Sequence, residues 1–178
     1  MGQANFVTFQ TVFKSIIDVI NSSKIFGQNS VDFSIFRDSD IKWPTNPPPF
    51  CLLVPGEFSR GTERDGGGRY QETWEGETET IIIVTNTLDV AFKDTNIFTS
   101  TDETTGPYVL VQRLIDFLEQ SWPTDSDNNL TLIELPVASR VDRPYRYQNS
   151  NQYVAISIHF NIKFLQTLQE DLPAKITS

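Results

Sequence analysis

The most constraining feature of this sequence is a strict alternation of side chains in YVAISIHFNIKFL (153–165). Every second position is a large apolar residue. These positions are Val154, Ile156, Ile158, Phe160, Ile162 and Phe164. Successive side chains of a β-strand point to opposite faces of its sheet, so a period of two held over eleven residues predicts a strand with one buried face.

Three further apolar runs predict strands of the same sheet. FCLLV (50–54) is a short buried strand that is expected to end at Pro55-Gly56. A longer strand is expected from residue 78 to about residue 92, and its centre is apolar at consecutive positions. That pattern indicates a central strand that is covered on both faces. LTLIELPV (130–137) predicts another strand.

Two segments have helical periodicity. Apolar side chains recur at helical spacing over residues 5–22, and Asn5 is the expected N-cap of this N-terminal helix. The second helix is expected to begin at Pro107, because proline suits the first helical position, and to end at Trp122-Pro123. Its apolar stripe consists of Leu110, Val111, Leu114, Ile115 and Leu118.

The order of these elements predicts an α+β domain. We expect a small, mainly antiparallel sheet of about four strands, with two helices packed on one face. A length of 178 residues suits a single domain (1–178), and thirteen phenylalanines can supply its core. Residues 166–178 are expected to form a loose tail. The proline-rich stretch WPTNPPP (43–49) is expected to be extended, and no role is assigned to it.

The glycine-rich, charged stretch at residues 57–77 lies between two of the apolar strands. It predicts a long projecting β-hairpin arm with the three glycines at 66–68 forming its tip. A compact domain seldom keeps about 20 residues without structure unless they are functional or disordered. We therefore expect the arm to become ordered against a neighbouring subunit, and a flexible loop is the alternative. The expected subunit-interface residues are Arg60, Arg64, Arg69, Tyr70 and Trp74.

The residues needed for familiar catalytic and metal sites are scarce. His159 is the only histidine, and on the polar side of its strand it is expected to face solvent or an interface. The chain has no G-x-S-x-G elbow for a Ser–His–Asp triad. One histidine and one cysteine, Cys51, do not make a zinc site. The glycine-rich stretch lacks the Lys-Ser/Thr of a P-loop and precedes a strand. We predict no enzymatic activity, no cofactor and no metal.

Four carboxylates alternate along the return limb of the expected hairpin. They are Glu72, Glu75, Glu77 and Glu79. We interpret them as side chains that point the same way along a solvated edge. Together with the nearby Trp74 and Tyr70, these carboxylates also suit a carbohydrate-binding or carbohydrate-active module. That module is the alternative from a different functional class.

Charge and targeting signals limit the partners. The formal net charge is −9, which disfavours general affinity for nucleic acid because such binding depends on Lys and Arg. A single cysteine excludes an intramolecular disulfide and fits a reducing compartment. We find no signal-peptide pattern, and no apolar run near the roughly 20 residues of a membrane span. We expect a soluble protein without a membrane partner, kept in the cytoplasm or in a particle assembled there.

Arginine and tyrosine alternate in the segment SRVDRPYRYQN, which follows the expected strand 130–137. The residues are Arg140, Arg143, Tyr145, Arg146 and Tyr147. Arginine with aromatic residues can stack on nucleic-acid bases, and the same residues are enriched at hot spots of protein interfaces. The acidic charge of the chain favours a protein partner. An ordinary solvated connection remains the alternative.

The element order resembles that of the tail terminator and tail-completion proteins of tailed bacteriophages, over residues 5–165. An amphipathic helix is followed by a strand after prolines (PPPFCLLVPGE) and then by the charged excursion. A long strand (TETIIIVTNTLDVAF), a helix (GPYVLVQRLIDFLEQ) and a final strand pair (LTLIELPV and QYVAISIHFNIKF) complete the order. The resemblance implies a structural virion protein of the tail and neck that is assembled in the host cytoplasm.

The resemblance also implies a mechanism. Such proteins form rings, usually hexamers, which cap the tail tube, stop its polymerisation and join the tail to neck or connector proteins; the tail sheath is a further expected partner. DNA passes through the ring without specific binding, and an acidic wall repels it. The four glutamates are then expected to face the lumen, and the Arg/Tyr segment to dock on the tube or the neck. A neck or head-closure ring is the alternative within virions, and a host regulator is an alternative outside them.

Overall fold

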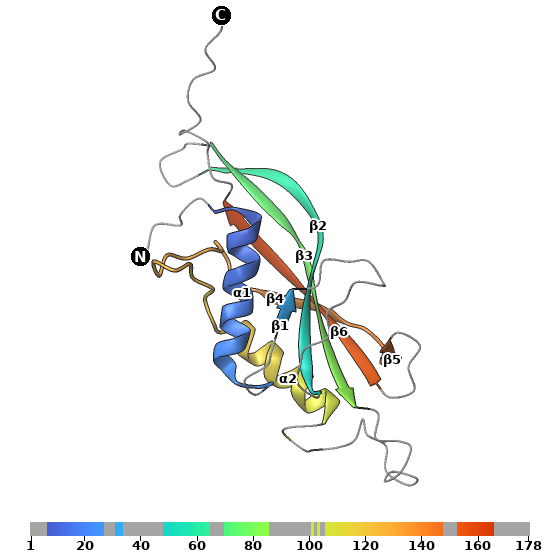
Figure 1. Cartoon of the computed structure of the whole chain (residues 1–178). Helices are drawn as coiled ribbons and strands as arrows, with labels where there is room; N and C mark the ends of the chain where they lie inside the picture. Colours follow the sequence, from blue (N-terminus) through green and yellow to red (C-terminus); the bar gives the residue numbers. More distant parts are fainter. Residues whose placement is uncertain are drawn as a thin grey trace, which may run out of the picture.

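The computed structural model describes residues 7–26, 31–33, 48–64, 70–85, 101, 103, 106–147 and 153–165. Within these residues, a mostly antiparallel sheet of six strands carries two α-helices (Figure 1). The helices are α1 (Phe9–Ser23) and α2 (Pro107–Leu118). The strands are β1 (Val31–Phe33), β2 (Phe50–Arg64), β3 (Tyr70–Thr85), β4 (Val137–Val141), β5 (Tyr145–Arg146) and β6 (Tyr153–Leu165). The predicted α+β class is confirmed, with more strands than the four expected.

The sheet has the order β1-β2-β3-β6-β4, and β5 pairs with β6 beside β4. Only β1 runs parallel to its neighbour, with Val31 opposite Cys51. β3 lies between β2 and β6, and its residues Ile81, Ile82 and Ile83 are all buried. The predictions of a central strand covered on both faces and of a strand over residues 153–165 are therefore confirmed.

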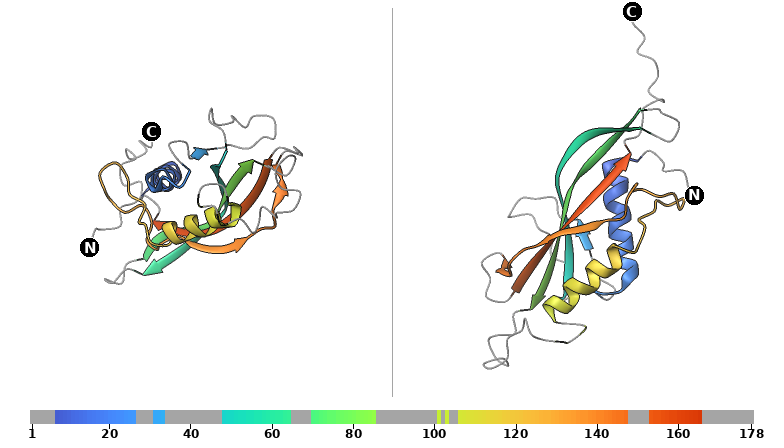
Figure 2. Two further views of the ribbon diagram at one scale, coloured as in Figure 1. Left: turned by 90° about the horizontal axis from the view of Figure 1, so that it is seen from below. Right: turned by 180° about the vertical axis from the view of Figure 1, so that it is seen from behind.

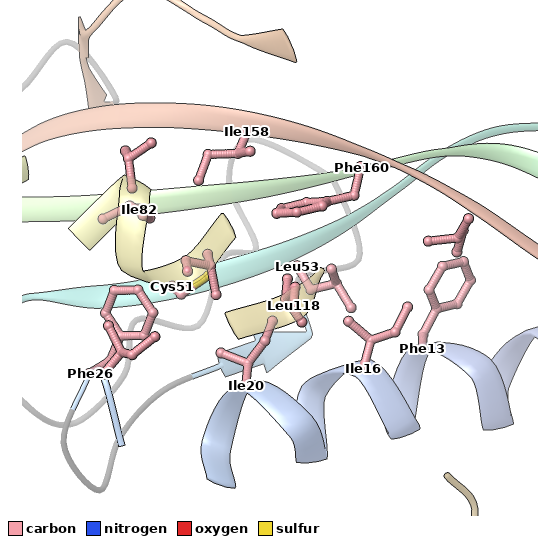
Figure 3. Packing of buried hydrophobic residues seen from close by; sticks show 14 of the residues in the cluster. Phe13, Ile16, Ile20, Phe26, Cys51, Leu53, Ile82, Leu118, Ile158 and Phe160 are labelled. Carbon is pink, nitrogen blue, oxygen red and sulfur yellow. The ribbon is translucent and has the colours of Figure 1, made fainter. Parts of the chain in front are cut away.

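The main core lies between the two helices and one face of the sheet. Figure 3 shows side chains of this core, which come from α1, α2, β2, β3 and β6. Those labelled in the figure are Phe13, Ile16, Ile20, Phe26, Cys51, Leu53, Ile82, Leu118, Ile158 and Phe160. Burying each such side chain fully contributes about 1.5–3 kcal/mol. Both helices share this cluster, so they cover the same face, as predicted.

A second, smaller cluster of buried apolar residues lies on the opposite face of the sheet. It consists of Phe50, Leu52, Val54, Ile81, Ile83, Tyr147 and Ala155. The alternate positions of β6 are therefore also covered, and Ala155, Ser157 and His159 are buried. The expectation of a single buried face on this strand is wrong.

Strand β2 does not end at Pro55-Gly56, as the sequence suggested. Its pairing with β3 continues to Arg64, with a register shift between Pro55 and Phe58. Proline is tolerated at such a bulge, where the regular ladder is interrupted. A Cβ on Gly56 would clash with the backbone of Glu77 across the pair, so glycine is required at this close approach.

A long arm that projects from the domain is not confirmed. The β2–β3 hairpin exists and pairs as far as Arg64 and Tyr70. However, β6 pairs with β3 as far as Thr73, opposite Leu165, so most of the hairpin belongs to the sheet. Figure 2 shows the strong twist of β2 and β3 from two further directions. The glycines at 66–68 lie outside the described residues.

The helix boundaries differ slightly from those predicted. α1 begins at Phe9, and its N-cap is Thr8, whose Oγ1 accepts a hydrogen bond from the Thr11 N–H at 3.2 Å. The expected cap, Asn5, lies outside the described residues. α2 begins at Pro107, as predicted, and ends at Leu118. Neither helix is long and apolar enough to cross a membrane.

The predicted strand at 130–137 is wrong. Leu130 makes one isolated bridge with Thr124, and the strand β4 begins only at Val137. The apolar Leu132 is buried without belonging to a strand, and Pro136 has no N–H to donate to a ladder. Residues 43–47, 86–92 and 166–178, which carried other expectations, lie outside the described residues.

Candidate functional site

The Arg/Tyr segment, defined here as residues 139–147, forms the edge of the sheet. Its first part completes β4, whose Arg140 lies opposite His159 of β6. Its last part contains β5, whose Tyr145 lies opposite Ala155. The sequence had suggested a simple connection here. The segment is instead fastened to the sheet at several points, which are described next.

The strongest of these points is His159. This side chain was expected to face solvent or an interface; it is only 7% exposed, so it does not face solvent. Its Nδ1 lies 2.6 Å from Oε1 of Glu77, and its Nε2 lies 2.7 Å from Oδ2 of Asp142. Carboxylate oxygens only accept hydrogen bonds. Both ring nitrogens therefore lie at hydrogen-bonding distance from a carboxylate oxygen, and a ring nitrogen that carries a proton donates to it.

Arg140 completes this group, which we call the His159 cluster (Glu77, Arg140, Asp142 and His159). The Arg140 Nε donates to Oδ1 of Asp142 at 2.9 Å, and its Nη2 lies 3.7 Å from Oε1 of Glu77. The pKa of Asp142 is lowered, chiefly by the hydrogen bond from His159; burial opposes this shift, and the charges of His159 and Arg140 add to it. The cluster joins β3, β4 and β6 by charge-assisted hydrogen bonds.

The chemistry open to this cluster is limited by its own pairing. Carboxylates already lie beside both nitrogens of His159, so a substrate or a metal would have to displace one of them to reach the ring. Oxygens of Glu79 and Asp142 and a nitrogen of His159 lie within 4.8 Å of one another, a spacing that could hold a cation. The Arg140 guanidinium, 3.1 Å from His159 Nε2, supplies positive charge there instead. The arrangement is that of an ion-pair network.

Two tyrosines provide the remaining anchors of the Arg/Tyr segment. Tyr145 and Ser157 share a hydrogen bond between their hydroxyl groups at 3.3 Å. The pKa of Tyr145 is raised, mainly because the phenol is partly buried. Tyr147, which the sequence suggested as a docking residue, is instead buried in the second core cluster at 5% exposure. It is therefore an anchor and not part of the surface.

Several side chains beside these anchors, and part of Tyr145 itself, remain accessible to solvent. Val137 is 54% exposed, and Val141 and Tyr145 are each 39% exposed. Arg143 and Arg146 are also exposed. We call this surface the docking edge (Val137, Val141, Arg143, Tyr145 and Arg146). Within the described part of the chain, Arg143 forms no ion pair.

The residues predicted for a subunit-interface arm are not part of the docking edge. Arg60 forms an ion pair with Glu72 at 3.1 Å, and its guanidinium lies 5.6 Å from the centre of the Trp74 ring. Trp74 also packs edge-on against Phe9, with ring centres 5.1 Å apart. Its aromatic surface therefore contacts its own chain. The side chains of Arg64, Arg69 and Tyr70 lie outside the described residues.

The four alternating glutamates do not share one face. Glu75, Glu77 and Glu79 lie on the face opposite the helices, with Ile81 and Ile83. Glu72 differs from them by an odd number of positions, so it lies on the other face, where it pairs with Arg60. The expectation of four carboxylates pointing the same way is wrong for Glu72.

A hollow of about 440 Å³, which we call the acidic hollow, lies beside the register shift in the pairing of β2 with β3. It is lined by Glu57, Phe58, Ser59, Glu75, Gly76, Glu77 and Asn161. A side chain at Gly76 would clash with Glu57 and with Phe58, so glycine permits this close approach of the two strands. The signal in the sequence was the pair of strand glycines, which indicates a bulge or a close approach of two backbones.

No protein-family model matches this chain, and no curated protein is significantly similar to it in sequence. Any assignment of function therefore rests on the residues and their geometry.

Proposed function

We propose that this protein is a structural virion protein of the tail-terminator type. In this proposal, identical copies form a ring that caps the tail tube, stops its polymerisation and joins the tail to the neck. The support comes from the element order quoted above and from the α+β fold, in which both helices cover one face of the sheet. The observation that carries the proposal is the docking edge.

The docking edge has the properties of a protein-binding surface. The Arg/Tyr segment is held by the His159 cluster, by the hydroxyl pair of Tyr145 and Ser157, and by the buried Tyr147. A surface that is ordered before binding loses little conformational entropy on association. Arginine and tyrosine are also among the residues that dominate binding energy at interfaces. The edge therefore suits docking on another protein.

The open carboxylates suit a channel through which DNA passes. Glu75, Glu77 and Glu79 lie together on the face that the two helices leave free, and Glu75 has a side chain that is 65% exposed. Glu77 is already paired with His159 and Arg140, and Glu75 and Glu77 border the acidic hollow, so Glu79 is the residue proposed for the lining. If Glu79 faces the lumen, each copy adds negative charge to the wall. A negative wall repels the phosphates of DNA and lets the duplex slide. Glu72 is left out of this proposed lining, since it lies on the other face.

A role without catalysis is part of the proposal. His159 is the only histidine of the chain, and the carboxylates of Glu77 and Asp142 engage both of its nitrogens. A carbohydrate site built on Trp74 gains no support, because Phe9 and Arg60 already contact its ring. A sugar would have to displace them to stack on the indole.

The test is a binding assay with assembled particles. The purified chain is mixed with polymerised tail tubes and, separately, with portal or neck complexes, and each mixture is sedimented and imaged by electron microscopy. We expect rings at one end of each tube and an arrest of tube growth. Binding to portal complexes alone would favour the neck-ring alternative. A chain that stays monomeric and binds neither particle would contradict the proposal.

A matched pair of variants connects this assay to the docking edge. Arg143→Glu reverses a charge on the edge, whereas Lys14→Glu reverses an exposed charge on α1. We expect the first variant to lose capping and the second to keep it. Equal capping by both variants would remove the docking edge from the proposal.

A further inference from the structure

The docking edge is a basic surface on an acidic chain. Arg140, Arg143 and Arg146 lie within seven residues of one another, whereas the whole chain has a net charge of −9. Arg140 is neutralised by Asp142, but Arg143 makes no ion pair with any residue that the structure describes. The edge therefore keeps a local positive charge and fits a negatively charged partner.

The partner must also have apolar contacts to offer. Val137, Val141 and Tyr145 are the large apolar or aromatic side chains that the edge exposes. Nucleic acid is a poor match, because its binding depends on many cationic contacts with phosphates and the rest of this chain repels it. An acidic protein surface with an apolar wall is the better match.

The acidic hollow of the same chain has the negative charge that this match requires. Glu57, Glu75 and Glu77 line it together with Phe58, whose ring packs against Phe9 on the side of the helices. Glu77 is bound to His159, and Glu75 lies 4.0 Å from Lys163. The exposed Glu57 forms no ion pair within the described residues, so the hollow keeps negative charge. Its volume of about 440 Å³ falls in the range of pockets that hold small ligands.

Arg143 cannot reach the hollow of its own chain. It lies between Val141, opposite Ile158, and Tyr145, opposite Ala155, whereas the hollow begins at Asn161. Four residues along β6 separate Arg143 from the level of the hollow by about 13 Å, and three strand spacings across the sheet separate it from Glu57 on β2 by about 14 Å. Arg143 and Glu57 can therefore meet only between different molecules.

We propose that the docking edge binds the acidic hollow of a second copy of this chain, with Arg143 facing Glu57. The inference rests on the proposed function, because it identifies the contact that would join neighbouring copies of the ring. Each molecule carries one docking edge and one hollow. A contact between two different surfaces leaves one of each free for the next copy, and it generates a ring when the rotation closes.

Charge reversal with rescue tests this contact in the full-length chain. Arg143→Glu and Glu57→Arg each place like charges opposite one another, and the combined variant restores an opposite-charge pair. Lys14→Glu, on the exposed side of α1, is the control. The readout is the molar mass in sedimentation velocity at a series of protein and salt concentrations, with the fold of each variant checked by circular dichroism.

We expect each single reversal to weaken self-association at least about tenfold, because close charge pairs across interfaces are strongly coupled. The combined variant should recover most of that loss, and Lys14→Glu should associate like the unmodified chain. Self-association of Arg143→Glu at the unmodified strength, or a combined variant that recovers nothing, would overturn the inference. If either reversal prevents folding, Arg143→Gln and Glu57→Gln replace it and should show smaller losses in the same direction.

The outcomes separate this inference from the proposed function. An unmodified chain that assembles while all the variants assemble equally well would leave the ring in place and refute this contact. An unmodified chain that stays monomeric at every concentration would refute both.

Discussion

His159 fastens the edge of the sheet, so its replacement gives a quantitative prediction. In the variant His159→Gln the side chain stays polar, but a single amide nitrogen and an oxygen that only accepts replace the two ring nitrogens. Glu77 and Asp142 would then face each other across the site with only Arg140 between them. We expect the folded state to lose stability, because two charge-assisted hydrogen bonds are weakened or lost.

The magnitude follows from the burial of the partners. A hydrogen bond to a charged group contributes about 1.5–3 kcal/mol, so the two bonds of His159 contribute about 3–6 kcal/mol when fully shielded from water. The side chains of Glu77 and Asp142 are 38% and 39% exposed, so water replaces part of each lost bond. Halving the sum gives about 1.5–3 kcal/mol, which lowers Tm by about 3–12 °C for a chain of this size.

The assay is urea and thermal unfolding at neutral pH, with Lys163→Gln as the matched control. Lys163 lies on the same strand and faces Glu75 and Glu134, whose side chains are 65% and 67% exposed. The Lys163 side chain is only 15% exposed, but its nitrogen lies 3.8–4.0 Å from carboxylates that water reaches, and such ion pairs contribute at most about 1 kcal/mol. If His159→Gln costs no more free energy than Lys163→Gln, the cluster does not hold the edge and the reasoning fails.

Three further predictions concern other parts of the fold. The pKa of Asp142 is lowered in the folded state, so its carboxylate stabilises the fold above the unfolded pKa of 3.8, and this contribution disappears as the pH falls below that value. In acid-unfolding curves, the stability of Asp142→Asn should therefore differ less from that of the unmodified chain at low pH than at neutral pH. A difference that stays constant with pH would contradict this assignment. Gly76→Ala should cost about 1–3 kcal/mol in urea unfolding, because the new Cβ would lie 2.8 Å from Cα of Phe58. Gly61→Ala is its control, since that Cβ would meet only Oγ1 of Thr73 at 3.1 Å, and equal losses for both glycines would refute the argument. Burial raises the pKa of the Cys51 thiol, so a thiol reagent should modify it only as the protein unfolds in urea; rapid modification of the native protein would contradict this burial.

Local patterns predicted the elements whose large apolar side chains repeat with a fixed period. The alternation over residues 153–165 predicted β6, and Pro107 with the apolar stripe after it predicted α2. Each apolar pattern marks the face of the element that the main core covers, so a short window of sequence is enough to predict the element.

The edge strand left no such pattern in the sequence. In β4, Val137, Ser139, Arg140 and Val141 are all exposed, so no apolar period distinguishes the strand from a connection. For that reason the strand was predicted in the more apolar run at residues 130–137. That run buries Leu132 and makes a backbone hydrogen bond from Ile133 to Lys163 of β6, but it does not form a strand.

The environment of His159 depends on residues that are remote along the chain. Asp142 and Glu77 are 17 and 82 positions away, and only the register of three strands brings them to the ring nitrogens. Sequence parity alone placed His159 on the polar side of β6. It could not place the carboxylates that bury it.

The charged stretch at residues 57–77 was predicted to project from the domain because its apolar contacts are few and join residues that are far apart in the sequence. Phe58 and Trp74 pack beside Phe9 of α1, which precedes them by about 50 residues or more. Gly56 and Gly76 allow the backbones of β2 and β3 to approach each other closely there. The glycines therefore shape the sheet and the acidic hollow, where the sequence had suggested a free arm.

Native mass spectrometry of the unmodified, full-length chain tests the central claim most directly. The account predicts one dominant species at low salt, with a mass that is a whole multiple of the chain mass, and its dissociation as added salt screens the contact between Arg143 and Glu57. A spectrum that contains only the monomer at every salt and protein concentration would contradict the claim that copies of this chain assemble into a ring.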